Sequence, residues 1–462
     1  MKSDKKLFGT DGIRGMANEQ PMTGEMVMAV GRAIPFVLKK HNIVKTSPRG
    51  ERKIRIVVGK DTRLANYMLE HALASGICSM GADVILMGPL PTPGVAYVTQ
   101  SMRADAGIMI SASHNPYMDS GIKVFTEDGF KLPDLFEEEI ESLVFSKEID
   151  KHRPTGEFIG KAFRIEDAIG RYNVFLKSQF SKEADLVGIK MVVDCANGAA
   201  YKVAPLVFEE LGAEVFSIGI SPNGVNINER CGAMYPTNCA AVTHQIGADL
   251  GLALDGDGDR CILSDENGEI VDGDVIIGLC ALEMSKNGIL KKNTVVTTPM
   301  TNIGVELSLK ENNISMVRAQ VGDRYVVECM RKNNFNLGGE QSGHIIFLDQ
   351  STTGDGLVAA LKILEIMKST GKPLSELKKK IRLFPQVCEN VKIKRKLPLE
   401  EMVELQKEIK AAEDELKQRG RVFVRYSGTE SLARVMVEGE NLDTIRKISA
   451  RLSSLIHNQL GN

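Results

Sequence analysis

Residues 106–116 read Ala-Gly-Ile-Met-Ile-Ser-Ala-Ser-His-Asn-Pro, an apolar run that ends in a polar turn. Apolar runs also precede residues 255–260, Asp-Gly-Asp-Gly-Asp-Arg, and residues 338–344, Gly-Gly-Glu-Gln-Ser-Gly-His. The first turn offers a serine hydroxyl, the second a cluster of carboxylates for a hard cation, and the third a group of polar side chains. Together they indicate metal-assisted phosphoryl transfer.

Each of these turns follows the last of three short apolar runs, and the runs recur in the same order. They lie at residues 54–58, 84–87 and 106–110; at 190–194, 214–218 and 249–254; and at 294–298, 315–318 and 335–337. Helical stretches between them predict right-handed βαβ units and mostly parallel sheets. Ligands bind beyond the carboxyl ends of such strands, so the three turns are expected to converge on one cleft. The alternative, that they are ordinary turns, does not explain three different chemistries at matching places.

The C-terminal part has a different pattern. Residues 389–394 alternate like a strand, 399–418 have helical spacing, 421–424 and 433–437 read as a hairpin, and 442–459 as an amphipathic helix. This order predicts a smaller α+β domain.

A chain of 462 residues is too long for one hydrophobic core. The predicted fold class is α/β, with three similar domains built on mixed or parallel sheets and a C-terminal α+β domain, all around a central cleft. The expected domains are 1–156 with the serine turn, 157–258 ending in the aspartate turn, 259–372 with the glutamate–histidine turn, and 373–462.

The composition excludes several classes of protein. Lys and Arg number 58 and Asp and Glu 60, so no basic excess indicates nucleic acid or membrane as a partner. No apolar segment has the length of a signal core or a membrane span, and the eight cysteines form no Cys-x-x-Cys pair. We therefore expect a cytoplasmic protein with reduced thiols. A homodimer is compatible with this interpretation.

Asp255, Asp257 and Asp259 alternate with glycines, which allow a tight turn that aims three carboxylates at one point. Ligands that are all oxygen favour Mg²⁺. An EF-hand is the alternative, but the strand that starts at Cys261 interrupts the longer loop that it needs. Arg260, directly after the turn, is expected to neutralise a substrate phosphate.

Ser113 is a weak nucleophile unless a cation or a base lies close to it. His114 and Lys123 are near in sequence and are candidates for that role. A Ser-His pair by itself is more often a loop cap, so the interpretation depends on the neighbouring motifs.

Several other turns offer groups that bind anions or hydroxyls. Arg425, Ser427, Gly428, Thr429 and Arg434 supply two guanidinium groups, two hydroxyls and a glycine turn, a set suited to a phosphate that is held but not attacked. Arg14 lies in a glycine-rich loop and is a second anion contact. Glu340, Ser342 and His344 suit sugar hydroxyls. Each group has a plainer interpretation as a polar turn, so the sequence alone leaves both open.

The chain resembles the α-D-phosphohexomutase superfamily, and most closely its branch that acts on amino sugars. The motifs that carry the resemblance occur in family order: residues 8–15 (Phe-Gly-Thr-Asp-Gly-Ile-Arg-Gly), 110–116, 121–123 (Gly-Ile-Lys), 255–260, 321–324 (Val-Gly-Asp-Arg), 338–344 and 425–430 (Arg-Tyr-Ser-Gly-Thr-Glu). Tyr426 and Ser431 replace the basic residue and the proline that the family pattern leads us to expect, which affects the stiffness of that loop rather than its presumed ligands.

The resemblance implies a role for each motif. Ser113 would carry the transferable phosphate, and Mg²⁺ would be bound by that phosphate and by Asp255, Asp257 and Asp259. The remaining implied roles are acid or base catalysis by Lys123 and His344, sugar contacts from Glu340 and Ser342, recognition of the sugar's orientation by Gly322, Asp323 and Arg324, and binding of the non-reacting phosphate by Arg425, Ser427, Gly428, Thr429 and Arg434.

The implied activity is an isomerase reaction on a hexosamine phosphate, from the 6-phosphate to the 1-phosphate, with a sugar 1,6-bisphosphate as intermediate and primer. A phosphomannomutase or phosphoglucomutase of the same superfamily is the nearest alternative. A Mg²⁺-dependent sugar phosphatase and a non-catalytic sugar-phosphate binder are alternatives of other classes.

Overall fold

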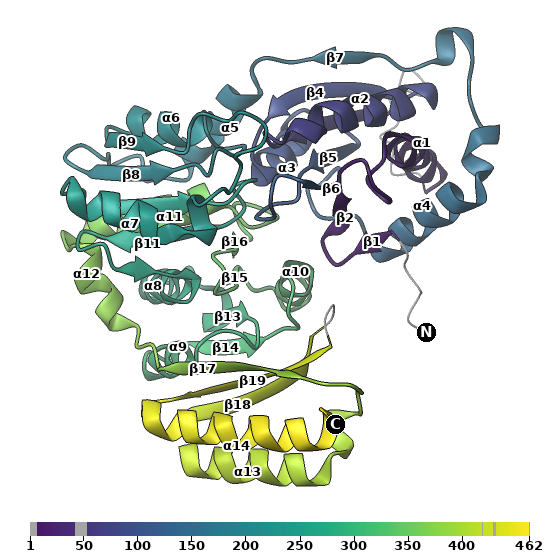
Figure 1. Ribbon diagram of the computed structural model, residues 1–462. Coiled ribbons are helices and arrows are strands. Elements are labelled where there is room, and N and C mark those ends of the chain that lie inside the picture. Colours follow the sequence, from purple (N-terminus) through teal and green to yellow (C-terminus); the bar gives the residue numbers. More distant parts are fainter. Residues whose placement is uncertain (1–6, 42–52, 418, 428–430, 462) are drawn as a thin grey trace.

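The computed structural model describes residues 7–41, 53–417, 419–427 and 431–461. The described residues form four sheets that follow one another along the chain, and Figure 1 shows them arranged as an arc with the N-terminal and C-terminal domains at its ends. The predicted fold class, three α/β domains and a C-terminal domain of a different kind, is confirmed.

The first sheet has seven strands in the order β1-β2-β6-β5-β3-β4-β7. Strands β5, β3 and β4 and the edge strand β7 run parallel, whereas β6, β2 and β1 form an antiparallel part at the other edge. Every residue of β5 is buried, which explains its uninterrupted apolar sequence. The strands are β1 (Phe8–Gly9), β2 (Gly12–Met16), β3 (Arg55–Lys60), β4 (Asp83–Pro89), β5 (Ala106–Ile110), β6 (Asp119–Thr126) and β7 (Ala162–Arg164), and the helices are α1 (Gly24–Lys40), α2 (Leu64–Ser79), α3 (Thr92–Ser101) and α4 (Asp134–Ser146).

The second sheet has five strands in the order β12-β11-β10-β8-β9, and the third has four in the order β14-β13-β15-β16. In each sheet an antiparallel strand follows directly after the loop that carries the polar turn. The second domain contains β8 (Lys190–Asp194), β9 (Glu214–Ile218), β10 (Leu250–Leu254), β11 (Cys261–Asp265), β12 (Ile270–Val271), α5 (Ala168–Ser178), α6 (Val203–Glu210) and α7 (Pro236–Gln245). The third contains β13 (Thr294–Thr297), β14 (Ser315–Arg318), β15 (Leu337–Gly339), β16 (Ile345–Phe347), α8 (Gly273–Lys286), α9 (Ile303–Glu311), α10 (Asp323–Asn333), α11 (Gly356–Thr370) and α12 (Leu374–Leu377).

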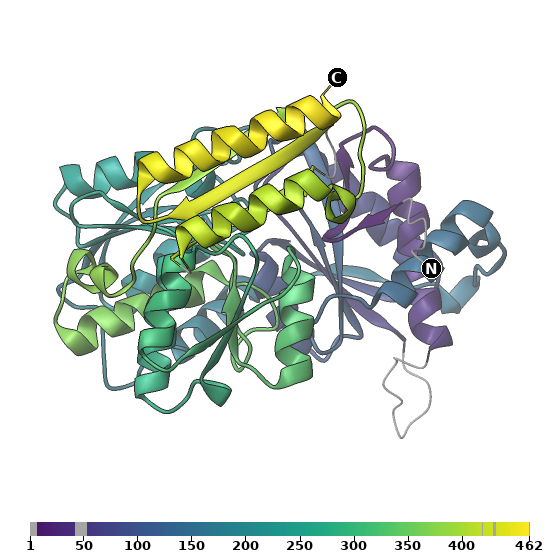
Figure 2. The same ribbon diagram turned by 90° about the horizontal axis from the view of Figure 1, so that it is seen from below.

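The C-terminal domain is a three-stranded antiparallel sheet covered on its outer face by two helices that lie side by side (Figure 2). Its elements are β17 (Gln386–Lys392), α13 (Val403–Leu416), β18 (Gly420–Tyr426), β19 (Leu432–Gly439) and α14 (Leu442–Leu460). Short 3₁₀ turns occur at Glu148–Lys151, Gly156–Phe158, Gly232–Met234, Lys291–Asn293, Lys378–Lys380 and Leu399–Glu401. Within the described ranges, no helix combines the length and the apolar character that a membrane crossing requires.

Two of the sheets extend beyond the expected domain ends. Strand β7 joins the first sheet beyond residue 156, and β11 and β12 continue the second sheet beyond residue 258. In the second sheet the reason is that the chain leaves the aspartate turn as the antiparallel strand β11, which pairs with β10, and not as the start of the third domain.

The hydrophobic clusters link some of the domains and separate others. One apolar cluster runs from Val57 of the first domain through Leu252 of the second to Leu361 of the third, whereas the C-terminal domain has its own cluster around Val435 and Leu452. Continuous apolar packing therefore joins the first three domains, although the first domain also has a second cluster of its own. Polar contacts join the fourth domain to the third. One of these contacts is the bond from the Arg421 guanidinium to the carbonyl of Thr301, at 2.7 Å.

Candidate active site

The serine turn and the aspartate turn meet where the first and second domains join. The Ser113 hydroxyl donates a hydrogen bond of 2.7 Å to Oδ2 of Asp255, although the two residues are 142 positions apart in the chain. Both side chains are buried. The carboxyl ends of β5 and β10 therefore bring a nucleophile to a cluster of carboxylates.

A buried arginine holds the serine turn in shape. Ser113 has a φ of 52°, in the left-handed region that non-glycine residues seldom adopt. Nη2 of Arg63 donates to the carbonyls of Ser113 and Asn115 at 2.9 and 2.8 Å, and Asp61 accepts from Nε at 2.8 Å. Asn228 of the second domain adds a bond of 2.9 Å to the same Ser113 carbonyl. The strained backbone is thus fixed by groups from two domains.

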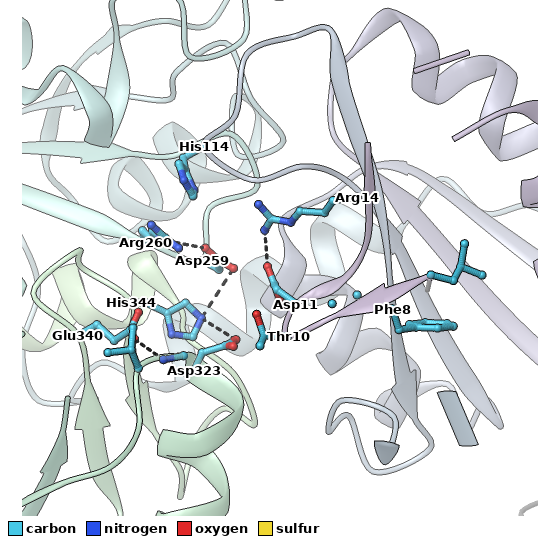
Figure 3. A pocket seen from close by; sticks show the side chains of 15 residues that line it. Phe8, Thr10, Asp11, Arg14, His114, Asp259, Arg260, Asp323, Glu340 and His344 are labelled. Atoms are coloured by element: carbon cyan, nitrogen blue, oxygen red, sulfur yellow. Dashed lines mark hydrogen bonds and ion pairs between the residues drawn. The ribbon is translucent and has the colours of Figure 1, made fainter. Parts of the chain in front are cut away.

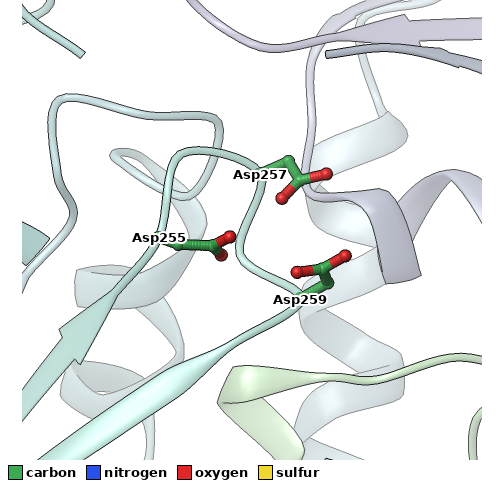
Figure 4. Close-up of side chains that lie close together, drawn as sticks. All are labelled: Asp255, Asp257 and Asp259. Atoms are coloured by element: carbon green, nitrogen blue, oxygen red, sulfur yellow. The ribbon is translucent and has the colours of Figure 1, made fainter. Parts of the chain in front are cut away.

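The three aspartates lie around one point (Figure 4). One carboxylate oxygen from each lies within 4.8 Å of the others, and all three residues are buried. Gly258 has a φ of 69°, and a Cβ on Gly256 would lie only 2.6 Å from the Ser113 carbonyl oxygen. The two glycines are therefore required by the turn and by its close approach to the serine loop.

Lys123 supplies positive charge beside this cluster. Its Nζ lies 3.0 Å from Asp257, 3.1 Å from Asp259 and 3.4 Å from Asp11. Burial alone would lower the pKa of Lys123, but these carboxylates raise it well above its usual range. Burial would raise the pKa of Asp257, but Lys123 holds it below its usual range.

The pKa of Asp255 moves the other way. Burial, and then the neighbouring Asp259 and Asp257, raise it well above its usual range. The buried Oδ1 atoms of Asp257 and Asp259 have no hydrogen-bond partner within the described residues. Oxygen atoms in this position fit a hard cation, so the chain has the geometry of a Mg²⁺ site.

A cleft of about 590 Å³ opens in front of these groups, a size typical of small-molecule sites (Figure 3). Ser113 and Lys123 lie behind its wall, whereas His114, Arg260 and Arg14 line it. The lining residues come from all of the first three domains: Leu7, Phe8, Gly9, Thr10, Asp11, Gly12, Arg14, His114, Asp259, Arg260, Val321, Gly322, Asp323, Glu340 and His344.

The cationic side of the cleft contains three of the expected residues. Arg14 pairs with Asp11, and Arg260 lies 3.9 Å from Asp259. Burial alone would lower the pKa of Arg260, but Asp259 and Asp255 raise it. Burial, and then Arg260 and Arg14, lower the pKa of His114 to about 4, so its imidazole is neutral at pH 7. This side therefore presents fixed positive charge to an anion.

The third domain supplies the opposite wall. Nε2 of His344 lies 3.7 Å from Asp259 and 3.6 Å from Asp323, which places the glutamate–histidine turn beside the aspartate turn. Glu340 accepts a hydrogen bond of 3.1 Å from the amide of Gly322. The three predicted turns therefore converge on the cleft.

Some of the predicted residues lie elsewhere. Arg324, expected at the sugar, directs its guanidinium to the first domain, where it pairs with Asp134 and with Glu137 at 2.6 Å. Ser342 is exposed in its turn and does not line the cleft. Asp323 and Arg324 are the first two residues of α10, and successive side chains on a helix point in different directions. A sequence motif does not show which of the two faces the cleft.

The expected phosphate pocket belongs to the C-terminal domain. Arg425 and Arg434 are register partners on β18 and β19, and Ser427 is buried beyond them. Figure 1 shows this hairpin ending on the side of the molecule where α10 and β1 face each other. Gly428 and Thr429 lie outside the described residues.

Several residues that shape the site could not be assigned a role from the sequence, namely Asp11, Asp61, Arg63, Thr92, Lys131 and Asn228. Thr92, for example, donates a bond of 2.6 Å to Asp257 from the start of α3. Asp11 lies in the glycine-rich loop of residues 8–15 and Arg63 in the polar stretch Gly-Lys-Asp-Thr-Arg at residues 59–63, and both stretches could have pointed to these residues. Asn228 lies in a loop without a comparable motif.

Comparison with known proteins gives the family. Models described as phosphoglucomutase/phosphomannomutase domains I, II, III and C-terminal match residues 5–151, 170–268, 272–384 and 389–455. The chain is 55% identical to phosphoglucosamine mutases of Syntrophotalea carbinolica and Citrifermentans bemidjiense, over 99% of its length and 98% and 99% of theirs. The chain belongs to the phosphoglucosamine mutase family. Membership in the phosphoglucosamine mutase family makes it an isomerase of the phosphohexomutase type.

Solved structures agree on the fold. A phosphoglucomutase/phosphomannomutase family protein from Burkholderia thailandensis superimposes with a TM-score of 0.77 at 22% identity, covering 97% of both chains. An N-acetylphosphoglucosamine mutase from Aspergillus fumigatus gives 0.68 at 18% identity, covering 98% of this chain and 95% of that one. The four-domain architecture is therefore shared well beyond the phosphoglucosamine mutase family.

Replacing Arg63 with methionine tests how the serine turn is held. The change leaves Asp61 buried and unpaired and removes the donors to four carbonyls, so we expect the free energy of unfolding of the first three domains to fall by about 3–5 kcal/mol. Urea unfolding followed by circular dichroism measures it. Arg171→Met, which removes an exposed helix-surface pair, is the matched control and should leave the transition unchanged. Equal transitions for both variants would contradict the role of Arg63.

Proposed function

We propose that this enzyme interconverts glucosamine 6-phosphate and glucosamine 1-phosphate through a phosphorylated Ser113 and a glucosamine 1,6-bisphosphate. The observation that carries the proposal is the contact between the Ser113 hydroxyl and Asp255 at the back of a cleft whose far wall is the Glu340–His344 turn. The nucleophile and the carboxylate cluster thus lie behind a cleft whose lining includes polar groups suited to a sugar, which supports the proposal.

A phosphoryl group on Ser113 would change the balance of charge around the three aspartates. The ester oxygen has no proton, so the hydrogen bond to Asp255 is lost and phosphate oxygens face three buried carboxylates. Lys123 is already shared among Asp11, Asp257 and Asp259. Further positive charge is required, and the unpartnered oxygens of Asp257 and Asp259 are suited to hold it.

Ser113 as phosphoserine, with Asp255, Asp257 and Asp259, would hold one Mg²⁺. When bound, Mg²⁺ offsets the charge on the transferring phosphoryl oxygens. Arg260, Arg14 and Lys123 contribute fixed cationic groups around the same point, so that little reorganisation is needed as charge moves from the serine to the sugar hydroxyl.

The sugar would bind against the third domain. The Glu340 carboxylate and the Gly322 carbonyl offer acceptors for its hydroxyls, and His344 and Lys123 are the candidates for moving a proton to and from the reacting oxygen. Ser342 and Arg324 would require a change in side-chain direction to take part.

The non-reacting phosphate would bind to the C-terminal domain through Arg425, Ser427, Gly428, Thr429 and Arg434. Two guanidinium groups in register suit a phosphate dianion. Since the product of the first transfer carries phosphates at both ends, the intermediate can turn round in the cleft and return the other phosphate to Ser113. A sugar 1,6-bisphosphate from solution would load the serine by the same step.

Replacing Ser113 with alanine removes the atom that carries the phosphate. We expect no detectable interconversion and an unchanged thermal transition, measured with a coupled assay and by calorimetry. Intact-mass measurement after incubation with glucose 1,6-bisphosphate should show a phosphoryl group on the wild type and on Ser178→Ala, an exposed serine, but not on Ser113→Ala. Stoichiometric release of inorganic phosphate by the wild type would instead indicate a phosphatase, and binding without isotope exchange a non-catalytic binder.

Asp257→Asn tests the metal site. The amide keeps the shape of the side chain but lowers the charge of the cluster, so Mg²⁺ affinity of the phosphoenzyme, measured by titration calorimetry, should fall by at least about tenfold. Asp167→Asn, an exposed carboxylate, is the control and should bind as the wild type does. Unaltered Mg²⁺ affinity in Asp257→Asn would place the cation elsewhere.

Turnover on different sugars tests the substrate. Glu340 lines the cleft, and among the described residues its carboxylate forms no ion pair, so its negative charge favours a sugar with an ammonium group. We expect kcat/KM for glucosamine 6-phosphate to exceed that for glucose and mannose 6-phosphates by about tenfold or more, as a charged hydrogen bond of about 1.5–3 kcal/mol supplies. A higher kcat/KM on glucose or mannose phosphate would favour a phosphoglucomutase or phosphomannomutase.

A further inference from the structure

A lysine outside the family motifs joins the two walls of the cleft. Lys131 follows β6 after a tight turn, and its backbone is fixed by a bridge to Phe125. Its Nζ contacts Asp11 of the N-terminal loop and lies 2.5 Å from Oδ2 of Asp323, the first residue of α10 in the third domain. The side chain is only 13% exposed, so this is a shielded pair of contacts rather than a surface ion pair.

Lys131 does not face the substrate. Asp323 lines the cleft on one side and a second, smaller cavity of about 260 Å³ on the other, and Lys131 lines only that second cavity. It lies directly behind the wall that Asp323 and Asp11 present to the sugar. Any effect of Lys131 on the reaction must therefore pass through those two carboxylates.

The contacts of Lys131 belong to a chain of alternating charges. Asp11 also meets Arg14 and Lys123, and Asp323 also faces His344. Burial would lower the pKa of Lys131, but Asp323 and Asp11 raise it, so the lysine is charged at neutral pH. Without it, two carboxylates of the same sign would face each other across the junction of the first and third domains.

Other contacts also join the first and third domains, but they do not involve Asp11 or Asp323. Arg324 binds Glu137 at 2.6 Å, and the Arg331 guanidinium lies 3.9 Å from the ring centre of Phe130. These contacts hold the outer surface of α10 against the first domain. Within the described residues, the cation that touches both cleft-lining carboxylates is Lys131.

We infer that Lys131 is a positioning residue, which holds the Asp11 loop and the Asp323 loop at the separation needed to retain the sugar while the bisphosphate turns round. This inference rests on the proposed function. The wall formed by the two loops has to hold the sugar in two orientations, and a displacement of about 1 Å in such a wall is enough to cost activity on the order of 100-fold.

Lys131→Met removes the charge and keeps an unbranched side chain of similar length. We expect kcat/KM to fall about 10- to 100-fold. We also expect the variant to release several times more bisphosphate per turnover and to depend on added glucose 1,6-bisphosphate. Lys131→Arg, which keeps the cation, should restore most of both properties. Lys40→Met, which removes an exposed pair with Glu139 in the same domain, is the control and should match the wild type.

The outcomes are distinguishable. A wild-type enzyme without interconversion refutes the proposed function itself. If the wild type is active, unchanged kcat/KM and bisphosphate release in Lys131→Met overturn the role of Lys131 alone. Equal losses of activity in the Met and Arg variants, in proportion to the fall in their thermal midpoints, do the same. If Lys131→Met does not fold, Asp323→Asn weakens the same contact from the other side, and wild-type bisphosphate release by that variant also overturns the inference.

Discussion

Three buried carboxylates within 4.8 Å of one another repel unless positive charge lies beside them, and most of the site is arranged around this constraint. Lys123 contacts Asp257 and Asp259, Arg260 lies 3.9 Å from Asp259, and the Ser113 hydroxyl donates to Asp255. A phosphate on the serine would add a charge of about −1.5 to −2 at the same point, and a divalent cation would offset it. The cluster is therefore unfavourable by itself, and under the proposed mechanism a divalent cation would reduce the repulsion.

The constraint also depends on the apolar cluster that joins the first three domains. Lys123 comes from the first domain, the aspartates from the second, and His344 from the third. A shift of one domain against another would therefore change the distances between these charged groups. Continuous apolar packing from Val57 through Leu252 to Leu361 keeps these distances fixed. The C-terminal domain has a separate core, and none of its described residues lines the cleft.

Two buried polar side chains hold groups of the site in position. Arg63 fixes the backbone of the serine turn, and Lys131 joins two carboxylates from opposite walls. Neither side chain lines the cleft, yet each sets the position of groups that do. Catalysis that depends on positioning and charge requires such supports as much as it requires the reacting residues.

The sequence by itself determined the repeating strands, the chemistry of the three turns and the nature of the C-terminal domain. Strands at 190–194, 214–218 and 315–318 were predicted with their ends correct, because short β-rich runs bounded by turn residues mark the limits of a strand both in the core and at a sheet edge. Only the tertiary structure decided which charges meet. Arg324 was expected at the sugar but binds α4, Lys131 lay in no motif but bridges two domains, and the second sheet continues beyond residue 258. Local periodicity reports which side of an element is buried, whereas ion pairs between residues more than 100 positions apart depend on how whole domains pack.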